Sequence, residues 1–512
     1  MLSAPLFVAS LLLFVVAIDG QEGVGTACTA YGVAGTCQVG NACEGNWFSS
    51  VAGVVSGCGA FANNVRCCVP ACAGDNSLPG VCAASCTQAS LPNFASSGQS
   101  VCPQGATCCT PNDLSAQVAQ AAQLQNRVNL PGRLQVGDTI MIVAPSSATP
   151  LTPQTLPPLV ASVFGPMGLK VVYGANVYAT DDLGRVAGTD EQRAADMMTA
   201  FTSKTVKAIV AVGGGWGCAR MIDLLDYSVI RANPKPLLGY SDVSACIAAI
   251  VWRAGITSFV GPMMGSDWTN GNGNFARRAL MSPLPFAMTS FAGQTTTTVV
   301  SGKAAGRLVG GNLSVLSAMI GAKTPVFPAE GERLILILED VGEEMYRVDR
   351  LLSTMQLNGF LDRVDGFVWG TCFNCVGRGD VSTVVRRAML KLNKPSVIGV
   401  SFGHHGEQFT VPIGQEAVLD ADRRQLFLIR AATQANTPTL SSYVARTECG
   451  PTTNPAAPAN PVANVPGSCP APVPCVCAVA PTCPMCVMSD ASIETPLLAA
   501  AIVLVSLSSQ LT

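Results

Sequence analysis

The sequence contains a serine, a carboxylate and a histidine that could together carry out acyl transfer. His404 and His405 are the only histidines among the 512 residues, so a histidine base must be one of these two. Ser241 lies in the stretch Gly-Tyr-Ser-Asp, and Glu339 directly follows the apolar run Leu-Ile-Leu-Ile-Leu. A serine that passes its proton to a histidine, with a carboxylate orienting the imidazole, is the arrangement of a nucleophilic hydrolase. We therefore predict Ser241 as nucleophile, His404 as general base and Glu339 as the orienting acid.

The elements expected around these residues place all three at strand ends. Strands are expected over Leu334–Leu338 and Ser396–Val400, shortly before Glu339 and His404. Ser241 follows a short apolar run and precedes a segment of helical periodicity, which is the context of a nucleophile elbow. Ligands of parallel sheets bind at the carboxyl ends of the strands, so we expect the site there.

Each of these predictions has an alternative. Ser241 or Asp242 could simply cap the following helix, because the glycine usually found two positions after an elbow serine is Val243 here. His405 competes with His404 for the role of base. Glu339 could be one of several solvated acids at a strand end, and its rivals in the same loop are Asp340, Glu343 and Glu344.

A glycine-rich turn precedes the serine in the chain. Ala208–Val212 is an apolar run typical of a buried parallel strand, and Gly213, Gly214 and Gly215 follow it at once. Such a turn lets backbone amides come close to a ligand. We predict an oxyanion hole formed by the amide of Asp242 and that of Gly214 or Gly215.

The pattern of strands and helices predicts an α/β fold. Strands over Ile140–Ala144 and Lys170–Tyr173 alternate with helices over Leu156–Phe164 and Asp190–Thr202, and the alternation continues to about residue 265. This indicates an N-terminal catalytic domain with a parallel sheet. A second domain is expected to begin near Gly306.

Six blocks of the sequence resemble the LD-carboxypeptidase family of serine peptidases, peptidase family S66. In chain order they read GDTIMIVAPSS, GGGWG, PKPLLGYSD, GRLVGGNLS, LILEDVGEEMYRVDR and SFGHHGEQFTVPIG, within residues 133 to 430. The family includes murein tetrapeptide carboxypeptidases and microcin-immunity hydrolases. The resemblance implies a Ser–His–Glu triad between an α/β N-terminal domain and a mainly β C-terminal domain. Matched block by block, the triad falls on Ser241, Glu339 and the first histidine after Gly403, which is His404.

The same resemblance implies a substrate class. The expected reaction is hydrolysis, without metal or cofactor, of an amide bond between an L-centre and a terminal D-residue. Trp216, Tyr346 and Arg347, which lie in the matching blocks, are predicted to contact substrate. Family members often carry arginine before the Gly-Gly pair, whereas this chain has Gly213 there, a change that would alter specificity if that arginine holds substrate.

Composition bounds the partners and the compartment. The formal net charge of −2 gives no reason to expect nucleic acid as a partner. Of 22 cysteines, twelve lie between Cys28 and Cys109 and six between Cys449 and Cys486, which indicates an oxidising compartment. The first twelve form two six-cysteine repeats, which are expected to be disulfide modules because the region lacks histidine and paired zinc motifs. Cys372 and Cys375, in the body of the chain, are expected to be a buried thiol pair or a disulfide.

The two ends of the chain are apolar. Leu6–Ala17 resembles the core of a signal peptide, and Leu497–Leu507 follows small residues in the order typical of a GPI-attachment signal, with a short membrane helix as the alternative. The predicted organisation is a signal peptide (1–20), two Cys-rich modules (21–70 and 71–110), a helical linker (111–132), the two catalytic domains (133–290 and 300–432), a Pro/Cys-rich stalk (433–492) and a hydrophobic C-terminal signal (493–512).

These observations predict a secreted or surface-anchored serine carboxypeptidase that releases terminal D-Ala from bacterial murein peptides. Two alternatives stay open at this point. One is a serine hydrolase of microcin-like peptide conjugates, and the other is a non-catalytic protein that binds the bacterial wall. A lipid anchor to the membrane and a homodimer are both compatible with the sequence.

Overall fold

The computed structural model describes residues 113–124, 128–268, 271–282, 285–288, 296–323, 326–376 and 380–434, together with strands between residues 27 and 111. The predicted signal peptide, the disulfides of the Cys-rich modules, nearly all of the stalk and the C-terminal hydrophobic segment lie outside the described residues. Within those described ranges, none of the helices has the length and apolar character needed to cross a bilayer.

Two small antiparallel sheets occupy the region of the two cysteine repeats. The first has the order β3-β5-β2-β1-β4 and the second β6-β7-β9-β8. Their strands are β1 (Ala27–Ala30), β2 (Val33–Val39), β3 (Asn46–Phe48), β4 (Val55–Ser56), β5 (Val65–Val69), β6 (Ala71–Ala73), β7 (Pro79–Ala83), β8 (Phe94–Ser96) and β9 (Thr107–Pro111).

The N-terminal sheet has the order β11-β10-β12-β13-β14-β21, and its first five strands are parallel, as predicted. They are β10 (Thr139–Val143), β11 (Lys170–Tyr173), β12 (Val206–Ala211), β13 (Leu237–Gly239) and β14 (Ser258–Val260). The helices of this half are α2 (Leu156–Phe164), α3 (Asp190–Thr202), α4 (Cys218–Met221), η1 (Ile222–Leu224), α5 (Tyr227–Ala232), α6 (Val243–Ala249), its π-helical continuation η2 (Ile250–Ala254) and α7 (Asn272–Met281).

Local sequence explains where these helices begin. Thr189 and Gln192 form a reciprocal capping box at the start of α3. Asp226 accepts two backbone hydrogen bonds at the start of α5, a helix that the sequence pattern alone did not indicate. Strands β12 and β13 are almost fully buried, as expected for a parallel sheet covered on both faces.

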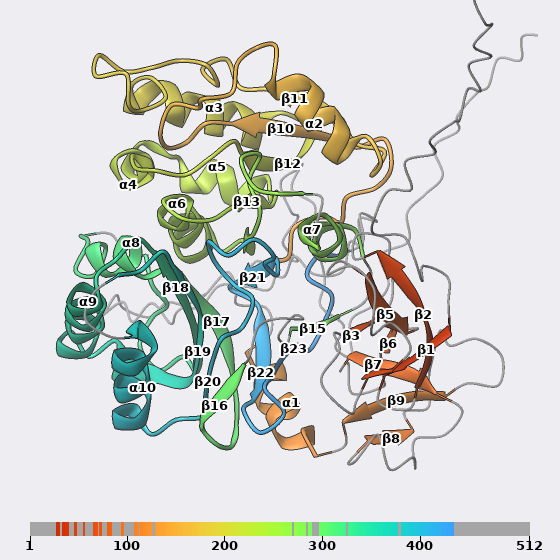
Figure 1. Ribbon diagram of the computed structural model, residues 1–512. Coiled ribbons are helices and arrows are strands. Elements are labelled where there is room, and N and C mark those ends of the chain that lie inside the picture. The colour runs from red at the N-terminus through yellow and green to blue at the C-terminus, as the bar shows by residue number, and fades with distance from the viewer. Residues whose placement is uncertain are drawn as a thin grey trace, which may run out of the picture. The chain divides into compact units, whose positions relative to one another are not determined.

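The C-terminal sheet has eight strands in the order β15-β23-β22-β17-β18-β19-β20-β16. They are β15 (Ala287–Met288), β16 (Thr297–Val300), β17 (Lys303–Asn312), β18 (Leu334–Val341), β19 (Val364–Phe373), β20 (Ser396–Ile398), β22 (Glu416–Asp420) and β23 (Gln425–Leu428). Strands β17 to β20 are parallel, and helices α8 (Leu313–Ala318), α9 (Met345–Leu357) and α10 (Val381–Leu392) lie beside them, with the short η3 (Leu361–Arg363) after α9 (Figure 1). This half is therefore a mixed α/β unit, with more helix than the mainly β domain that the resemblance implied.

One strand joins the two halves. β21 (Val411–Ile413) comes from the C-terminal part of the chain but pairs antiparallel with β14, so it completes the N-terminal sheet. The two halves consequently share a sheet, which the predicted division into domains 133–290 and 300–432 did not anticipate.

The helix expected in the linker is bound to the hydrolase body. Helix α1 (Ser115–Ala122) and the preceding Leu114 pack against the C-terminal sheet, in a cluster that includes Val418 and Phe427. Asp113 adds ion pairs at its start, to Lys303 Nζ at 2.7 Å and to Arg423 Nη2 at 2.8 Å. The segment is thus part of the folded body rather than a free tether.

Candidate active site

The turn that carries Ser241 has the strained backbone of a nucleophile elbow. Ser241 follows β13 and lies one residue before the N-cap of α6, with φ at +60°, a left-handed conformation that is uncommon for residues other than glycine. Such strain persists only where surrounding structure enforces it, and it is concentrated at functional sites. The conformation lifts the hydroxyl out of the sheet, as a reactive serine requires.

The glycine turn after β12 lies directly against this serine. A Cβ on Gly214 would be 2.8 Å from Ser241 Cβ and 3.1 Å from its Oγ, so only glycine permits this approach. Gly215 instead lies against the side chain of Ser147. The Trp216 amide donates a hydrogen bond to Ser147 Oγ at 3.2 Å. Of the two predicted oxyanion-hole glycines, Gly214 is the one that touches the serine side chain.

Asp242 joins the two turns. Its buried carboxylate accepts a hydrogen bond from the Cys218 amide at 2.9 Å, which ties the end of the glycine turn to the serine turn. Burial raises the pKa of Asp242 above its ordinary value. The side chain therefore holds the loops together, while its own amide, next to Ser241, stays the predicted oxyanion donor.

Glu339 is placed by an irregularity in the C-terminal sheet. Leu338 pairs with Trp369 and Asp340 pairs with Cys372, so β19 has one extra residue opposite Glu339. A bulge of this kind redirects the neighbouring side chain. Glu339 is 0% exposed and Asp340 is 1% exposed, so the alternative of solvated acids at this strand end is wrong.

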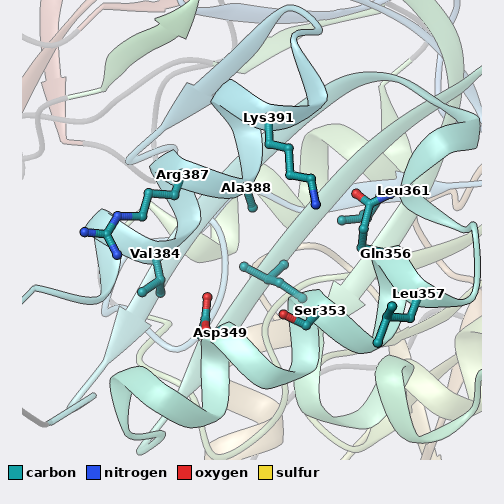
Figure 2. A pocket seen from close by; sticks show the side chains of 10 residues that line it. Asp349, Ser353, Gln356, Leu357, Leu361, Val384, Arg387, Ala388 and Lys391 are labelled. Atoms are coloured by element: carbon teal, nitrogen blue, oxygen red, sulfur yellow. The ribbon is translucent and has the colours of Figure 1, made fainter.

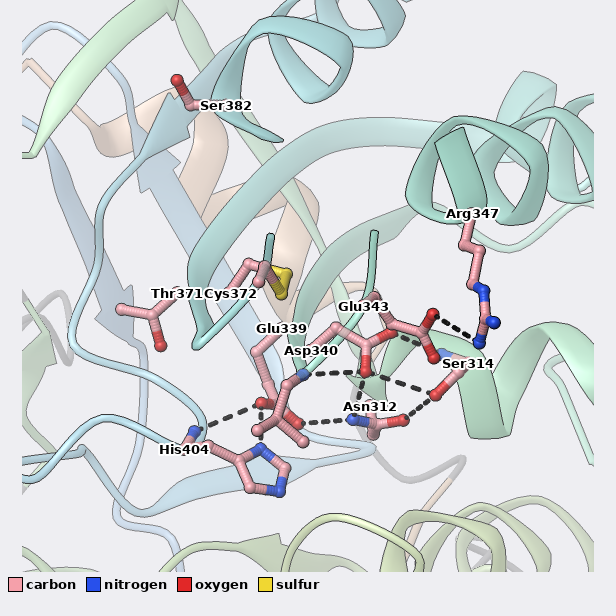
Figure 3. Close-up of a disulfide and its surroundings, with 12 residues drawn as sticks. Asn312, Ser314, Glu339, Asp340, Glu343, Arg347, Thr371, Cys372, Ser382 and His404 are labelled. Atoms are coloured by element: carbon pink, nitrogen blue, oxygen red, sulfur yellow. Dashed lines mark hydrogen bonds and ion pairs between the residues drawn. A yellow bond between two sulfur atoms is a disulfide. The ribbon is translucent and has the colours of Figure 1, made fainter. Parts of the chain in front are cut away.

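His404 is the partner of this buried acid. His404 Nδ1 is 2.7 Å from Glu339 Oε2, and the His404 amide donates to the same oxygen at 3.2 Å (Figure 3). Gly403, with φ at +108°, makes the approach possible, because a Cβ there would lie 2.4 Å from Glu339 Oε2. His405, the competing residue, is exposed on the adjacent loop.

Asn312 connects the acid to the nucleophile helix, a role that the sequence did not reveal. Its Nδ2 donates to Glu339 Oε1 at 3.2 Å and to Asp340 Oδ1 at 3.0 Å, and its amide donates to Ser244 Oγ on α6 at 3.1 Å. In the sequence, Asn312 stands out only as a helix start and a glycosylation sequon. Burial, reinforced by the nearby Glu339 carboxylate, raises the pKa of Asp340 to about 6.

Tyr240 brings the two parts of the site together. Its ring meets the His404 ring edge-on, with 4.8 Å between the centroids. Because Tyr240 immediately precedes Ser241, this contact places the nucleophile turn beside the base. The structure therefore places the turn that carries Ser241 next to the Glu339–His404 pair, with contributions from both halves of the molecule.

The residues predicted to contact substrate differ in their surroundings. Trp216 is 50% exposed beside the glycine turn. Tyr346 and Arg347 lie on the first turn of α9, where the guanidinium faces Glu343 and the Tyr346 hydroxyl rather than His404 (Figure 3). Trp216 thus lies on the same turn as Gly214, which touches Ser241, and Arg347 on α9 lies on the far side of Asp340 from His404 (Figure 3).

Two other features lie outside this cluster of side chains. Cys372 and Cys375 form a disulfide, which decides between the two states expected for this pair. A groove of about 350 Å³ between α9 and α10 has Leu352 and Val384 among its lining residues and none of the predicted site residues (Figure 2). In the parts of the chain that the structure describes, no group of three or more His, Cys, Asp or Glu side chains is placed to hold a metal ion.

Comparison with known proteins matches both halves of the molecule to domains of one protein family. Residues 140–261 match the LD-carboxypeptidase N-terminal domain, and residues 305–419 match the LD-carboxypeptidase C-terminal domain. A Bacillus subtilis protein named "Probable murein peptide carboxypeptidase" is 32% identical over 299 residues, covering 57% of this chain and 91% of that protein. The murein tetrapeptide carboxypeptidase of Pseudomonas aeruginosa is 30% identical over 251 residues, covering 46% of this chain and 80% of that protein.

The fold also has a counterpart among solved structures. The microcin C7 self-immunity protein MccF, in its ligand-free state, superposes with a TM-score of 0.54 at 24% identity, covering 60% of this chain and all of that structure. At this identity the likeness concerns the fold alone.

Proposed function

We propose that this chain, which belongs to the LD-carboxypeptidase family and is a serine-type carboxypeptidase, hydrolyses an L,D-amide bond and releases terminal D-Ala from murein peptides. The observation that carries the proposal is the 2.7 Å contact between Glu339 and His404, beside a strained serine turn. A buried carboxylate in this position orients the imidazole and stabilises its protonated form.

In the first half of the reaction Ser241 acts as nucleophile. Because Glu339 accepts the proton on Nδ1, His404 keeps Nε2 free to take the Ser241 hydroxyl proton as Oγ attacks the carbonyl carbon of the L-centre. The carbonyl oxygen becomes negatively charged and is stabilised by the amides of Gly214 and Asp242. His404 then gives its proton to the amine of the departing D-Ala.

The second half of the reaction releases the enzyme. Water enters after D-Ala has left and gives a proton to His404 as its oxygen attacks the ester on Ser241. The tetrahedral intermediate collapses, Ser241 recovers its proton and the shortened peptide departs with a free carboxylate. The partly exposed His404 ring leaves room for that water to approach.

The test is D-Ala release from a murein tetrapeptide. We expect release by the wild type, at least a thousandfold less by Ser241→Ala, and no change in Ser353→Ala, a control serine exposed on α9. A tetrapeptide ending in L-Ala should be spared. Release that is unchanged in Ser241→Ala would sink the assignment, and cleavage of a peptidyl-nucleotide conjugate in place of the tetrapeptide would favour the microcin-like alternative.

We also propose that the enzyme is secreted and held on the cell surface by a GPI anchor. The support is the apolar N-terminal run, the cysteine-rich flanks and the order of small and apolar residues at the C-terminus. Expression of the full chain in a eukaryotic cell tests this, because phosphatidylinositol-specific phospholipase C should release the protein into the medium. Retention after that treatment would favour the short membrane helix.

A further inference from the structure

The Cys372–Cys375 disulfide closes the end of the strand that lies beside the catalytic acid. Cys372 pairs directly with Asp340, one residue after Glu339 and next to the bulge (Figure 3). Both cysteines are half-buried, so a small dithiol can reach them. The turn between them contains Asn374 in a left-handed conformation with φ at +52°.

On one side this closed turn holds the loop that follows the acid. The Gly342 amide donates to Phe373 O at 2.8 Å, and the Val376 amide donates to Glu343 O at 3.0 Å. The Met345 amide, at the start of α9, donates to Val376 O at 3.1 Å. Three backbone hydrogen bonds therefore connect residues 373–376 to the segment leading away from Glu339.

On the other side the same strand holds the loop that carries the base. The Thr371 amide donates to Phe402 O at 3.1 Å, and the Thr371 hydroxyl lies 3.3 Å from the same oxygen. Phe402 is fully buried and lies two residues before His404. The end of β19 thus contacts the supports of both members of the acid–base pair.

We propose that the Cys372–Cys375 disulfide is a positioning element that keeps Glu339 and His404 in register. This inference rests on the proposed triad. Freed from the disulfide, the end of β19 gains conformational freedom, and the two loops that it connects can shift relative to each other. Because a misplacement of about 1 Å can cost about a hundredfold in rate, the effect falls on turnover rather than on substrate binding.

Dithiothreitol can reduce the Cys372–Cys375 disulfide by thiol–disulfide exchange. One thiolate of the reagent attacks a sulfur of the disulfide, and the S–S bond breaks to release the other cysteine as a thiolate. The second thiolate of the reagent then attacks the mixed disulfide and displaces the remaining cysteine thiolate. The protein gains two electrons and two protons as two thiols, and the reagent leaves as its cyclic disulfide. Reoxidation in air or by oxidised glutathione reverses the change.

The experiment compares the full chain in oxidised, reduced and reoxidised form with Cys372→Ser/Cys375→Ser. We expect reduction to lower kcat for tetrapeptide cleavage at least tenfold with KM within twofold, and reoxidation to restore it. The double variant should already have the low kcat and should not respond to dithiothreitol. A further loss on reducing the double variant would place the sensitivity in other cysteines of the chain and contradict the proposal.

Amide hydrogen exchange supplies a readout that needs no substrate. On reduction, peptides covering residues 338–346 and 400–406 should exchange at least tenfold faster, while a peptide from α3 should not change. Unchanged exchange in both segments, with kcat unchanged, would overturn the proposal. If the oxidised enzyme does not cleave the tetrapeptide, the proposed substrate is wrong, and the exchange measurement still decides the role of the disulfide.

Discussion

Replacing Glu339 by glutamine tests the central contact of the site with little change in shape. Glu339 Oε2 accepts both the His404 ring proton and the His404 amide, while Oε1 accepts from Asn312 Nδ2. A glutamine offers one accepting oxygen and one donating nitrogen, so whichever way the amide turns, a donor faces a donor. Because Glu339 is fully buried, that mismatch costs about 1–3 kcal/mol in the free energy of unfolding.

The loss in catalysis should be larger than the loss in stability. A hydrogen bond to a charged group contributes about 1.5–3 kcal/mol, which corresponds to roughly 10- to 150-fold in rate. In proteases with a Ser-His-Asp triad, the equivalent acid-to-amide change lowers kcat about 10⁴-fold, because the imidazole is also held in the wrong tautomer. We therefore expect Glu339→Gln to lower kcat by between about 10² and 10⁴, with KM little changed.

The assay couples D-Ala release to D-amino acid oxidase, with urea unfolding measured on the same preparations. Glu343→Gln is the matched control, because Glu343 lies in the same loop and faces Arg347 rather than His404. The control should keep kcat within twofold. Turnover above half the wild-type value in Glu339→Gln would refute the reasoning, and so would a large loss in the control.

Four other substitutions probe the supports of the site and of the fold. Gly403→Ala should lower kcat at least a hundredfold, because its Cβ would lie 2.4 Å from Glu339 Oε2; a normal tetrapeptide assay would contradict this. Asn312→Ala should reduce the free energy of unfolding in urea by about 2–4 kcal/mol, since it removes a helix cap and takes the Asn312 donor from buried Glu339 Oε1. Burial raises the pKa of Asp340 to about 6 from its ordinary value of 3.8, so its contribution to the free energy of unfolding should rise as the pH falls from 6 to 4; Asp340→Asn should remove that rise in urea melts. Leu114→Ala should lower the free energy of unfolding by about 2–5 kcal/mol, because Leu114 anchors α1 on the C-terminal sheet. An unchanged free energy of unfolding would show that α1 does not pack there.

The sequence predicted most of the regular elements because their local signals are strong. The observed bounds of α2, α3 and β11 agree with the prediction to the residue, and at the start of α3 a capping box supplies the local signal. α5 was missed because a six-residue helix is too short to show a recognisable helical periodicity. The crossing of β21 could not be predicted, since a three-residue strand has no local signal for its distant partner.

The site was predictable in its residue types but not in its supports. Ser241 was identifiable from the elbow-like turn around it, Glu339 from its place at the end of an apolar strand, and His404 from the scarcity of histidine in the chain. Asn312 and Tyr240 act through contacts with residues far away in the chain, and neither carries a charge that would single it out. In the sequence, Asn312 could be recognised only as a helix start and a glycosylation sequon, and Tyr240 only as the neighbour of the serine.

The strand shared between the two halves has a consequence for how the protein is made. Val260 of β14 pairs with Val411, 151 residues later, so the nucleophile half leaves the ribosome with an apolar edge strand that has no partner yet. At translation rates of about 5–20 residues per second, that edge waits roughly 8–30 seconds for its covering strand. An uncovered edge of this kind invites pairing with other nascent chains, so this hydrolase should depend on chaperones during synthesis.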